Sequence, residues 1–151
     1  MCIVAEKKFH KYLDTHLYSI QQIELIGDAI AAGFTIEEIE VVANPNFHWK
    51  QMMEVIRGLK AGLALEQVKQ YAKTEYNPRQ MYQIFLAMTA GFSQKKIDIL
   101  LDSCFDAAQM SVIRLGFLSG LTVQEVKKFA NPFLSADVMQ YYRVQIEQGH
   151  C

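Results

Sequence analysis

Three segments of the chain decide its fold: QMMEVIRGLKAG at residues 51–62, QMYQIFLAMTAG at 80–91 and QMSVIRLGFLSG at 109–120. Each segment begins with Gln-Met, ends on glycine and starts 29 residues after the segment before it. The closing glycine keeps the same step from Gly33 to Gly149. A fixed period of this length is the sequence signature of a repeat protein. The sequence therefore predicts a protein built from 29-residue repeats.

Each period predicts two helices. Met52, Val55, Leu59 and Leu63 follow one another at the spacing of an apolar helix face. The recurrent glycine predicts the end of this longer helix, because glycine readily adopts the left-handed conformation that closes a helix. A shorter helix is expected directly afterwards. The residues at its predicted N-cap are Thr35, Ser93 and Thr122.

A 29-residue hairpin cannot bury its apolar face alone, so neighbouring hairpins must stack. We therefore expect an all-α, superhelical array (a solenoid) of short helix-turn-helix repeats. The recurrent methionines, the return-loop aromatics of the Phe47 class and the first-turn glutamines are interpreted as structural, with each glutamine amide bonding loop backbone. The expected organisation is a single domain over 1–151, with units at about 20–48, 49–77, 78–106 and 107–135, a partial unit at 1–19 and a capping helix at 136–148.

Composition narrows the class of protein. The 151 residues are 51% hydrophobic and 21% charged, with a net charge of -1, which excludes a disordered chain and argues against a general nucleic-acid binder. Cys2, Cys104 and Cys151 are an odd number and widely spaced, so neither a disulfide framework nor a zinc site is expected. The chain has no signal-peptide core and no run of about 18 apolar residues. We expect a cytoplasmic protein without membrane contact.

No motif in the chain predicts catalysis. There is no glycine-rich phosphate loop, and the spacing of His10 and His16 does not place them on one helix face. Cys104 lies between Asp102 and Asp106, whose carboxylates should raise the pKa of its thiol and oppose a role as nucleophile. We therefore expect no catalytic residue, no metal and no cofactor, and an enzyme is the least favoured function.

The amino-acid sequence of the repeat is similar to that of a known group of helical-repeat proteins. QMSVIRLG at 109–116 and GLALEQVKQYAK at 62–73 resemble the tandem helical repeats of proteins from Firmicute phages and conjugative elements. The resemblance covers roughly residues 20–148, although Asp102-Ser103-Cys104 departs from the usual Asn-Pro turn. It implies a mobile-element protein with an interaction role. A narrower expectation is an inhibitor that occludes a bacterial defence nuclease.

Positions that vary between units predict a binding face. Equivalent sites on the longer helix hold Asp28, Arg57, Leu86 and Leu115, and a core position would not tolerate that change from acidic to basic to apolar. We expect this stripe to face solvent and to select a protein partner, or a second copy in a homodimer. Alternatively, its leucines pack against the next unit. The candidate partner-binding residues are Arg57, Lys60, Tyr82, Leu86, Leu115 and Leu118.

Charge is also segregated along the chain. Unit 20–48 holds five acidic and no basic residues, whereas unit 49–77 holds five basic and three acidic residues. Lysine pairs also recur on successive short helices. They could contact phosphates, so the alternative function is that of a nucleic-acid-associated accessory protein of a mobile element, with weak binding. The residues concerned are Lys95, Lys96, Lys127 and Lys128.

Overall fold

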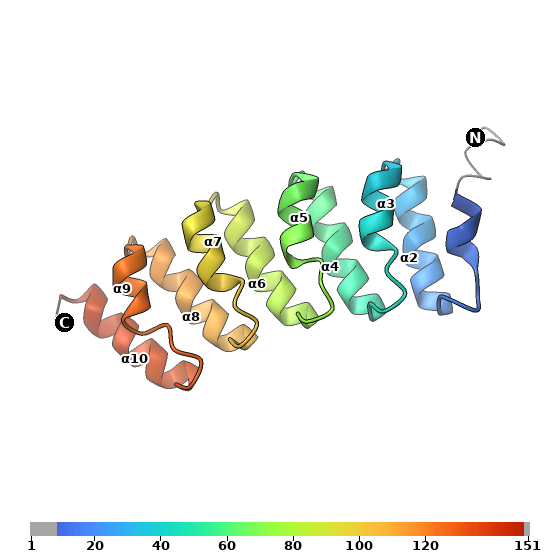
Figure 1. The fold of residues 1–151 in the computed structure, drawn as a ribbon. Helices are drawn as coiled ribbons and strands as arrows, with labels where there is room; N and C mark the ends of the chain where they lie inside the picture. The colour runs from blue at the N-terminus through green and yellow to red at the C-terminus, as the bar shows by residue number, and fades with distance from the viewer. Residues whose placement is uncertain (1–8, 150–151) are drawn as a thin grey trace. The chain divides into compact units, whose positions relative to one another are not determined.

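The computed structural model describes residues 9–149, which form helices, turns and loops without any strand. A short 3-10 helix, η1 (His10–Leu13), precedes the repeats. The longer helix of each repeat has 12 residues. These long helices are α2 (Ile20–Ala31), α4 (Trp49–Lys60), α6 (Pro78–Thr89), α8 (Ala107–Leu118) and α10 (Ala136–Glu147) (Figure 1). The short helices are α3 (Ile36–Val42), α5 (Leu65–Tyr71), α7 (Gln94–Leu100) and α9 (Val123–Lys127).

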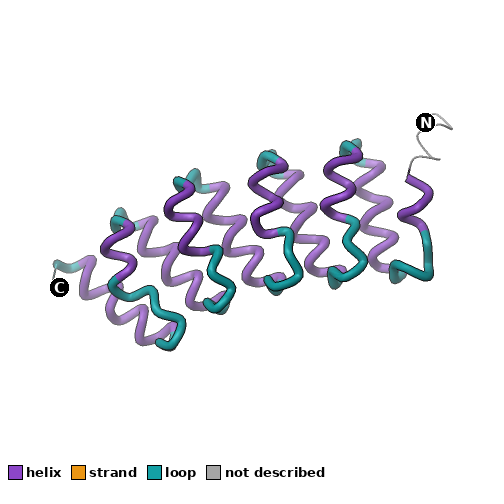
Figure 2. Tube along the Cα trace, in the orientation of Figure 1, coloured by secondary structure: helices purple, strands orange, loops and turns teal. Residues whose placement is uncertain are grey.

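The helix starts keep the period of the sequence. Each long helix begins 29 residues after the previous long helix, from residue 20 to residue 136, and each short helix begins 29 residues after the previous short one, from 36 to 123. Figure 2 shows the resulting alternation of helix and return loop along the chain. The prediction of an all-α fold built from repeated helical hairpins is confirmed.

The chain divides into two compact units, one ending at Pro78 and one beginning at Arg79. In the first unit, α2 packs against η1, α3 and α4, and α4 also packs against α3 and α5. In the second unit, α8 packs against α7, α9 and α10. Within each unit the long helices form one layer and the short helices form the other (Figure 1).

The core of each unit lies between these two layers. Met52 and Met81, which stand at the same place in successive repeats, are fully buried, as flexible apolar side chains that fill gaps between stacked helices should be. The return-loop aromatics Phe47, Tyr76 and Phe105 are also buried, in agreement with their interpretation as structural residues. Burial of such large side chains supplies most of the free energy that holds a hairpin array together.

The helix ends follow the predicted chemistry with one exception. Gly91 has a φ of 79°, its N–H donates to the Met88 carbonyl, and α6 ends as expected for a C′ glycine. Thr122 and Glu125 form a complete capping box at α9, and the Thr35 hydroxyl accepts from the Glu38 N–H at α3. Ser93 occupies the N-cap of α7 but its side chain makes no capping hydrogen bond.

Candidate functional site

The variable stripe on the long helices lies at the surface. In the first unit, Asp28 on α2 and Arg57 and Lys60 on α4 are exposed. In the second unit, Leu115 and Leu118 on α8 are exposed. These residues belong to the same two positions of the 29-residue repeat. Sequence alone therefore identified a set of solvent-facing positions whose chemistry changes from repeat to repeat.

The second unit carries the apolar part of this stripe. Leu118 is 53% exposed, Leu115 is 38% exposed and Tyr82 on α6 is 39% exposed. Leu86 is half-buried. The alternative prediction, that the leucines of the stripe pack against the next repeat, therefore holds in part for this residue. The Tyr82 ring stacks on the ring of Phe85, with 6.0 Å between ring centroids. Exposed large apolar side chains that gather on neighbouring positions are typical of interaction surfaces.

A hydrogen bond between the two helices fixes this surface. The Arg114 Nε on α8 donates to the Gln83 Oε1 on α6 at 2.9 Å, and both side chains are half-buried. The bond lies one residue before Leu115 and one residue after Tyr82 in the sequence. Because it holds α6 and α8 in one register, the exposed tyrosine and leucines occupy fixed relative positions and a partner could bind them without reordering the backbone.

In the first unit the stripe borders a small groove. Leu25, Met53, Ile56, Arg57 and Lys60 line a hollow of about 290 Å³ between α2 and α4. The Arg57 Nε donates to the carboxylate of Glu54 at 3.0 Å, one turn earlier on the same helix. The groove therefore has an apolar floor and a basic margin. Arg57 and Lys60 were predicted as surface residues. The apolar floor was not predicted, because the residue type at the positions of Leu25 and Ile56 changes between repeats, as Glu54 and Arg114 show.

The four candidate lysines do not form one patch. Lys95 and Lys127 line the same hollow of about 650 Å³ between α7 and α9, together with Asp98 and Gln124. Lys96 instead places its ammonium group over an aromatic ring, 5.4 Å from the centroid of Phe117. Lys128 is exposed beyond the end of α9 and does not line this hollow. Two of the four side chains are thus brought together.

The raised pKa expected at Cys104 has one of its two expected causes, Asp102, whereas the Asp106 carboxylate caps α8 by accepting from the Gln109 N–H. A hydrogen bond from the thiol to Asp102, and the negative charge of that carboxylate, raise the pKa of the exposed Cys104 thiol. A thiol with a raised pKa is a poor nucleophile at neutral pH. Among residues 9–149 no three His, Cys, Asp or Glu side chains gather as a metal site would require, and no helix is long and apolar enough to cross a membrane. Cys2, Cys151 and His150, and the N-terminal segment 1–8, lie outside the described residues.

Two exposed apolar side chains near the end of the chain were not predicted from the sequence. Phe133, in the loop before α10, is 95% exposed, and Tyr141 on α10 is 61% exposed. A signal for Phe133 was available, because the equivalent residues of earlier units are Asn46, Glu75 and Cys104, all of them exposed. Packing within the repeat does not explain an aromatic residue at a position that is exposed in every other repeat.

Comparison with known proteins adds no relative, since no family model, no curated protein and no solved structure matches the chain. The side chains on the long helices therefore carry the argument for function.

Proposed function

We propose that this chain is a non-enzymatic protein-binding module whose contact surface is the exposed face of α6 and α8. The observation that carries the proposal is the exposure of Leu115 and Leu118 at repeat positions that hold charged residues on α4. An exposed apolar side chain does not stabilise an isolated chain. When a partner covers it, burial of its apolar surface stabilises the complex.

The exposed apolar surface is small, so its burial would contribute modestly to the free energy of binding. Covering Tyr82, Leu115 and Leu118 would contribute roughly 2–4 kcal/mol before the costs of association, given their partial exposure. That is less than three fully exposed leucines would supply. Further affinity would have to come from the surrounding polar side chains. The expected partner is a protein with an apolar patch of similar extent.

The resemblance of the repeat to phage and conjugative-element proteins supports a narrower proposal. A small mobile-element protein of this kind could act by covering a surface of a host protein, for example a bacterial defence nuclease. Activity of such a nuclease with and without the purified chain would test this narrower role directly. An uninhibited nuclease would remove this role but leave the binding face itself in place.

The binding face is tested by affinity capture with a matched control. The variant Leu115→Asp with Leu118→Asp should lose the proteins that the natural chain retains, while its far-UV circular dichroism stays unchanged. Leu17→Asp is the control, because Leu17 is 58% exposed but lies outside the long helices. If the double variant captures the same proteins, or if the control loses them as well, the face of α6 and α8 is not the binding site.

A second candidate is weak contact with nucleic acid through Lys95 and Lys127, which line one hollow on the short-helix side. Asp98 lines the same hollow and reduces its net charge, so any binding should be weak and should fall steeply with salt. A gel-shift titration of the natural chain against Lys95→Ala with Lys127→Ala tests it. Tight, sequence-specific binding at physiological salt would favour this candidate over the first.

A further inference from the structure

The outer face of α10 presents apolar side chains at positions that are buried on α8. Val112 and Ile113 on α8 are buried, and α8 packs against α9 and α10. The equivalent residues on α10 are Tyr141 and Tyr142, which are 61% and 43% exposed. Val138, one turn earlier, is 40% exposed. Within residues 9–149 this face of the helix has no neighbour, although an apolar helix face of this kind is normally covered.

A further hairpin of the same repeat does not fit this face. On α8 the position that receives the next short helix is Gly116, where an added Cβ would lie 3.0 Å from the Phe129 ring. The equivalent residue on α10 is Gln145, whose side chain would occupy the space of that ring. Val138 also replaces the glutamine that bonds the following loop in the earlier repeats. The face has therefore lost the two features that a following repeat requires, yet it remains apolar.

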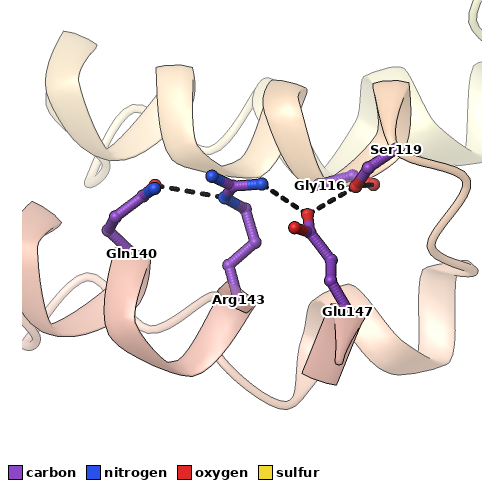
Figure 3. Close-up of polar contacts among 5 residues, drawn as sticks. All are labelled: Gly116, Ser119, Gln140, Arg143 and Glu147. Carbon is purple, nitrogen blue, oxygen red and sulfur yellow. Dashed lines mark hydrogen bonds and ion pairs between the residues drawn. The ribbon is translucent and has the colours of Figure 1, made fainter. Parts of the chain in front are cut away.

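Two charged side chains of α10, Arg143 and Glu147, are directed toward α8, whereas the third, Asp137, is exposed beside Val138. Figure 3 shows Gln140, Arg143 and Glu147 pointing toward α8, where the Glu147 carboxylate contacts both the Arg143 guanidinium and the Ser119 hydroxyl. The Arg143 Nε also donates to Gln140 Oε1 at 3.1 Å. In this network Arg143 and Glu147 pair with each other on the side of α10 that faces α8. Val138, Tyr141, Tyr142 and Gln145 then form an uncharged stripe on the opposite side.

An uncharged stripe can pair with a copy of itself without repulsion between like charges. Its residues follow the order i, i+3, i+4, i+7, which is symmetric about a point between Tyr141 and Tyr142. In an antiparallel pair related by a two-fold axis at that point, Tyr141 of one chain meets Tyr142 of the other, and Val138 meets Gln145. Aromatic pairs at such a centre are favourable contacts.

We propose that two copies of this chain associate through α10, packed antiparallel across a two-fold axis between Tyr141 and Tyr142. The exposed parts of these side chains amount to roughly 300 Å² per chain, or about 600 Å² in total, which is below the size of stable specific interfaces, so the dimer is weak and depends on concentration. The proposal does not depend on the partner-binding face, because Leu115 and Leu118 lie on α8 and not on this stripe.

Sedimentation equilibrium over about 1 µM to about 500 µM tests the pairing. The natural chain should shift from monomer toward dimer as concentration rises. Tyr141→Glu should weaken the dimer at least about tenfold, because it places two carboxylates beside the axis. Leu17→Glu is the matched control, since Leu17 is 58% exposed and lies outside the long helices, and it should dimerise like the natural chain. A natural chain that stays monomeric throughout, or a dimer that survives Tyr141→Glu, would overturn the proposal.

Disulfide trapping tests the antiparallel geometry separately. In a background with Cys2, Cys104 and Cys151 changed to serine, a mixture of Val138→Cys and Gln145→Cys chains should form a mixed disulfide on mild oxidation. Each variant alone should cross-link far less, because antiparallel packing places two copies of either position at opposite ends of the contact. Strong cross-linking of Val138→Cys with itself, and none in the mixture, would exclude this arrangement.

Discussion

The side-chain Nε2 of Gln51 donates a hydrogen bond of 2.7 Å to the backbone carbonyl of Tyr76, which lies 25 residues further along the chain. Its Oε1 accepts from the His48 N–H, so one buried amide joins the first turn of α4 to the return loop that follows α5. The same pairing recurs one repeat at a time in Gln22 with Phe47, Gln80 with Phe105 and Gln109 with Leu134. In each of these repeats a glutamine side chain thus holds the return loop by a hydrogen bond to its backbone.

Removal of this amide should cost stability. Gln51→Ala leaves the buried Tyr76 carbonyl without its side-chain donor, and such a loss costs about 1–3 kcal/mol. Gln67→Ala is the matched control, because the Gln67 Oε1 only accepts from the exposed Ala64 N–H. Urea unfolding of both variants measures the difference. Equal free energies of unfolding would show that the amide does not secure the loop.

The helix-ending glycine gives a second prediction. Gly91→Val should destabilise by at least about 1–2 kcal/mol, because a β-branched residue is strained at positive φ. No atom lies within 4 Å of the position of an added Cβ, so the cost is conformational and not steric. Lys95→Ala, at an exposed site four residues later, should change stability by less than about 0.5 kcal/mol. Equal melting temperatures would contradict the assignment of Gly91 as a C′ residue.

A third prediction concerns the close approach of α5 to α4. A Cβ on Gly58 in α4 would lie only 1.9 Å from the Tyr71 hydroxyl on α5. Gly58→Ala should therefore destabilise by about 1–3 kcal/mol, although alanine favours a helix more than glycine does. In a Tyr71→Phe background the same change should cost at least about 1 kcal/mol less. A double-mutant cycle by chemical denaturation measures this coupling, and additive effects would refute the contact.

Tyr71 also predicts how stability depends on alkaline pH. Burial, and then the nearby Glu54 carboxylate, raise the pKa of Tyr71 above its ordinary value of 10.0. An unfolded tyrosine loses its proton near that value while the folded one keeps it, so the free energy of unfolding falls as pH rises above about 10. Tyr71→Phe should lower this slope by up to about 1.4 kcal/mol per pH unit. Equal slopes for the natural chain and Tyr71→Phe from pH 8 to 11 would count against the burial of Tyr71.

The repeat made most of the fold predictable. Helix starts, the glycines at helix ends and the glutamine contacts with loop backbone all follow from residues that recur every 29 positions, because a repeated environment selects the same side chain each time. The exposed stripe was found by the opposite signal, a position at which Asp28, Arg57 and Leu115 are equally acceptable. A single sequence can reveal both signals when it contains repeats that can be aligned with one another.

Features that occur once were not predictable in this way. The placement of Lys96 over aromatic rings depends on Phe117, a residue that comes from the following long helix and has no fixed counterpart in other repeats. The exposed stripe of α10 was missed because Tyr142 stands at a position that is core in every earlier repeat. Contacts between unique residues depend on three-dimensional packing, which periodicity does not encode.

Site-specific photo-cross-linking tests the proposed binding face most directly. The photoreactive residue p-benzoylphenylalanine replaces Leu118 on α8 in one variant, and Gln124 in the hollow between α7 and α9 in the other. After irradiation in a lysate of cells that produce the chain, the variant at position 118 should form a covalent adduct with a protein partner, and the variant at 124 should not. An adduct formed from position 124 and none from position 118 would contradict the assignment of the long-helix face.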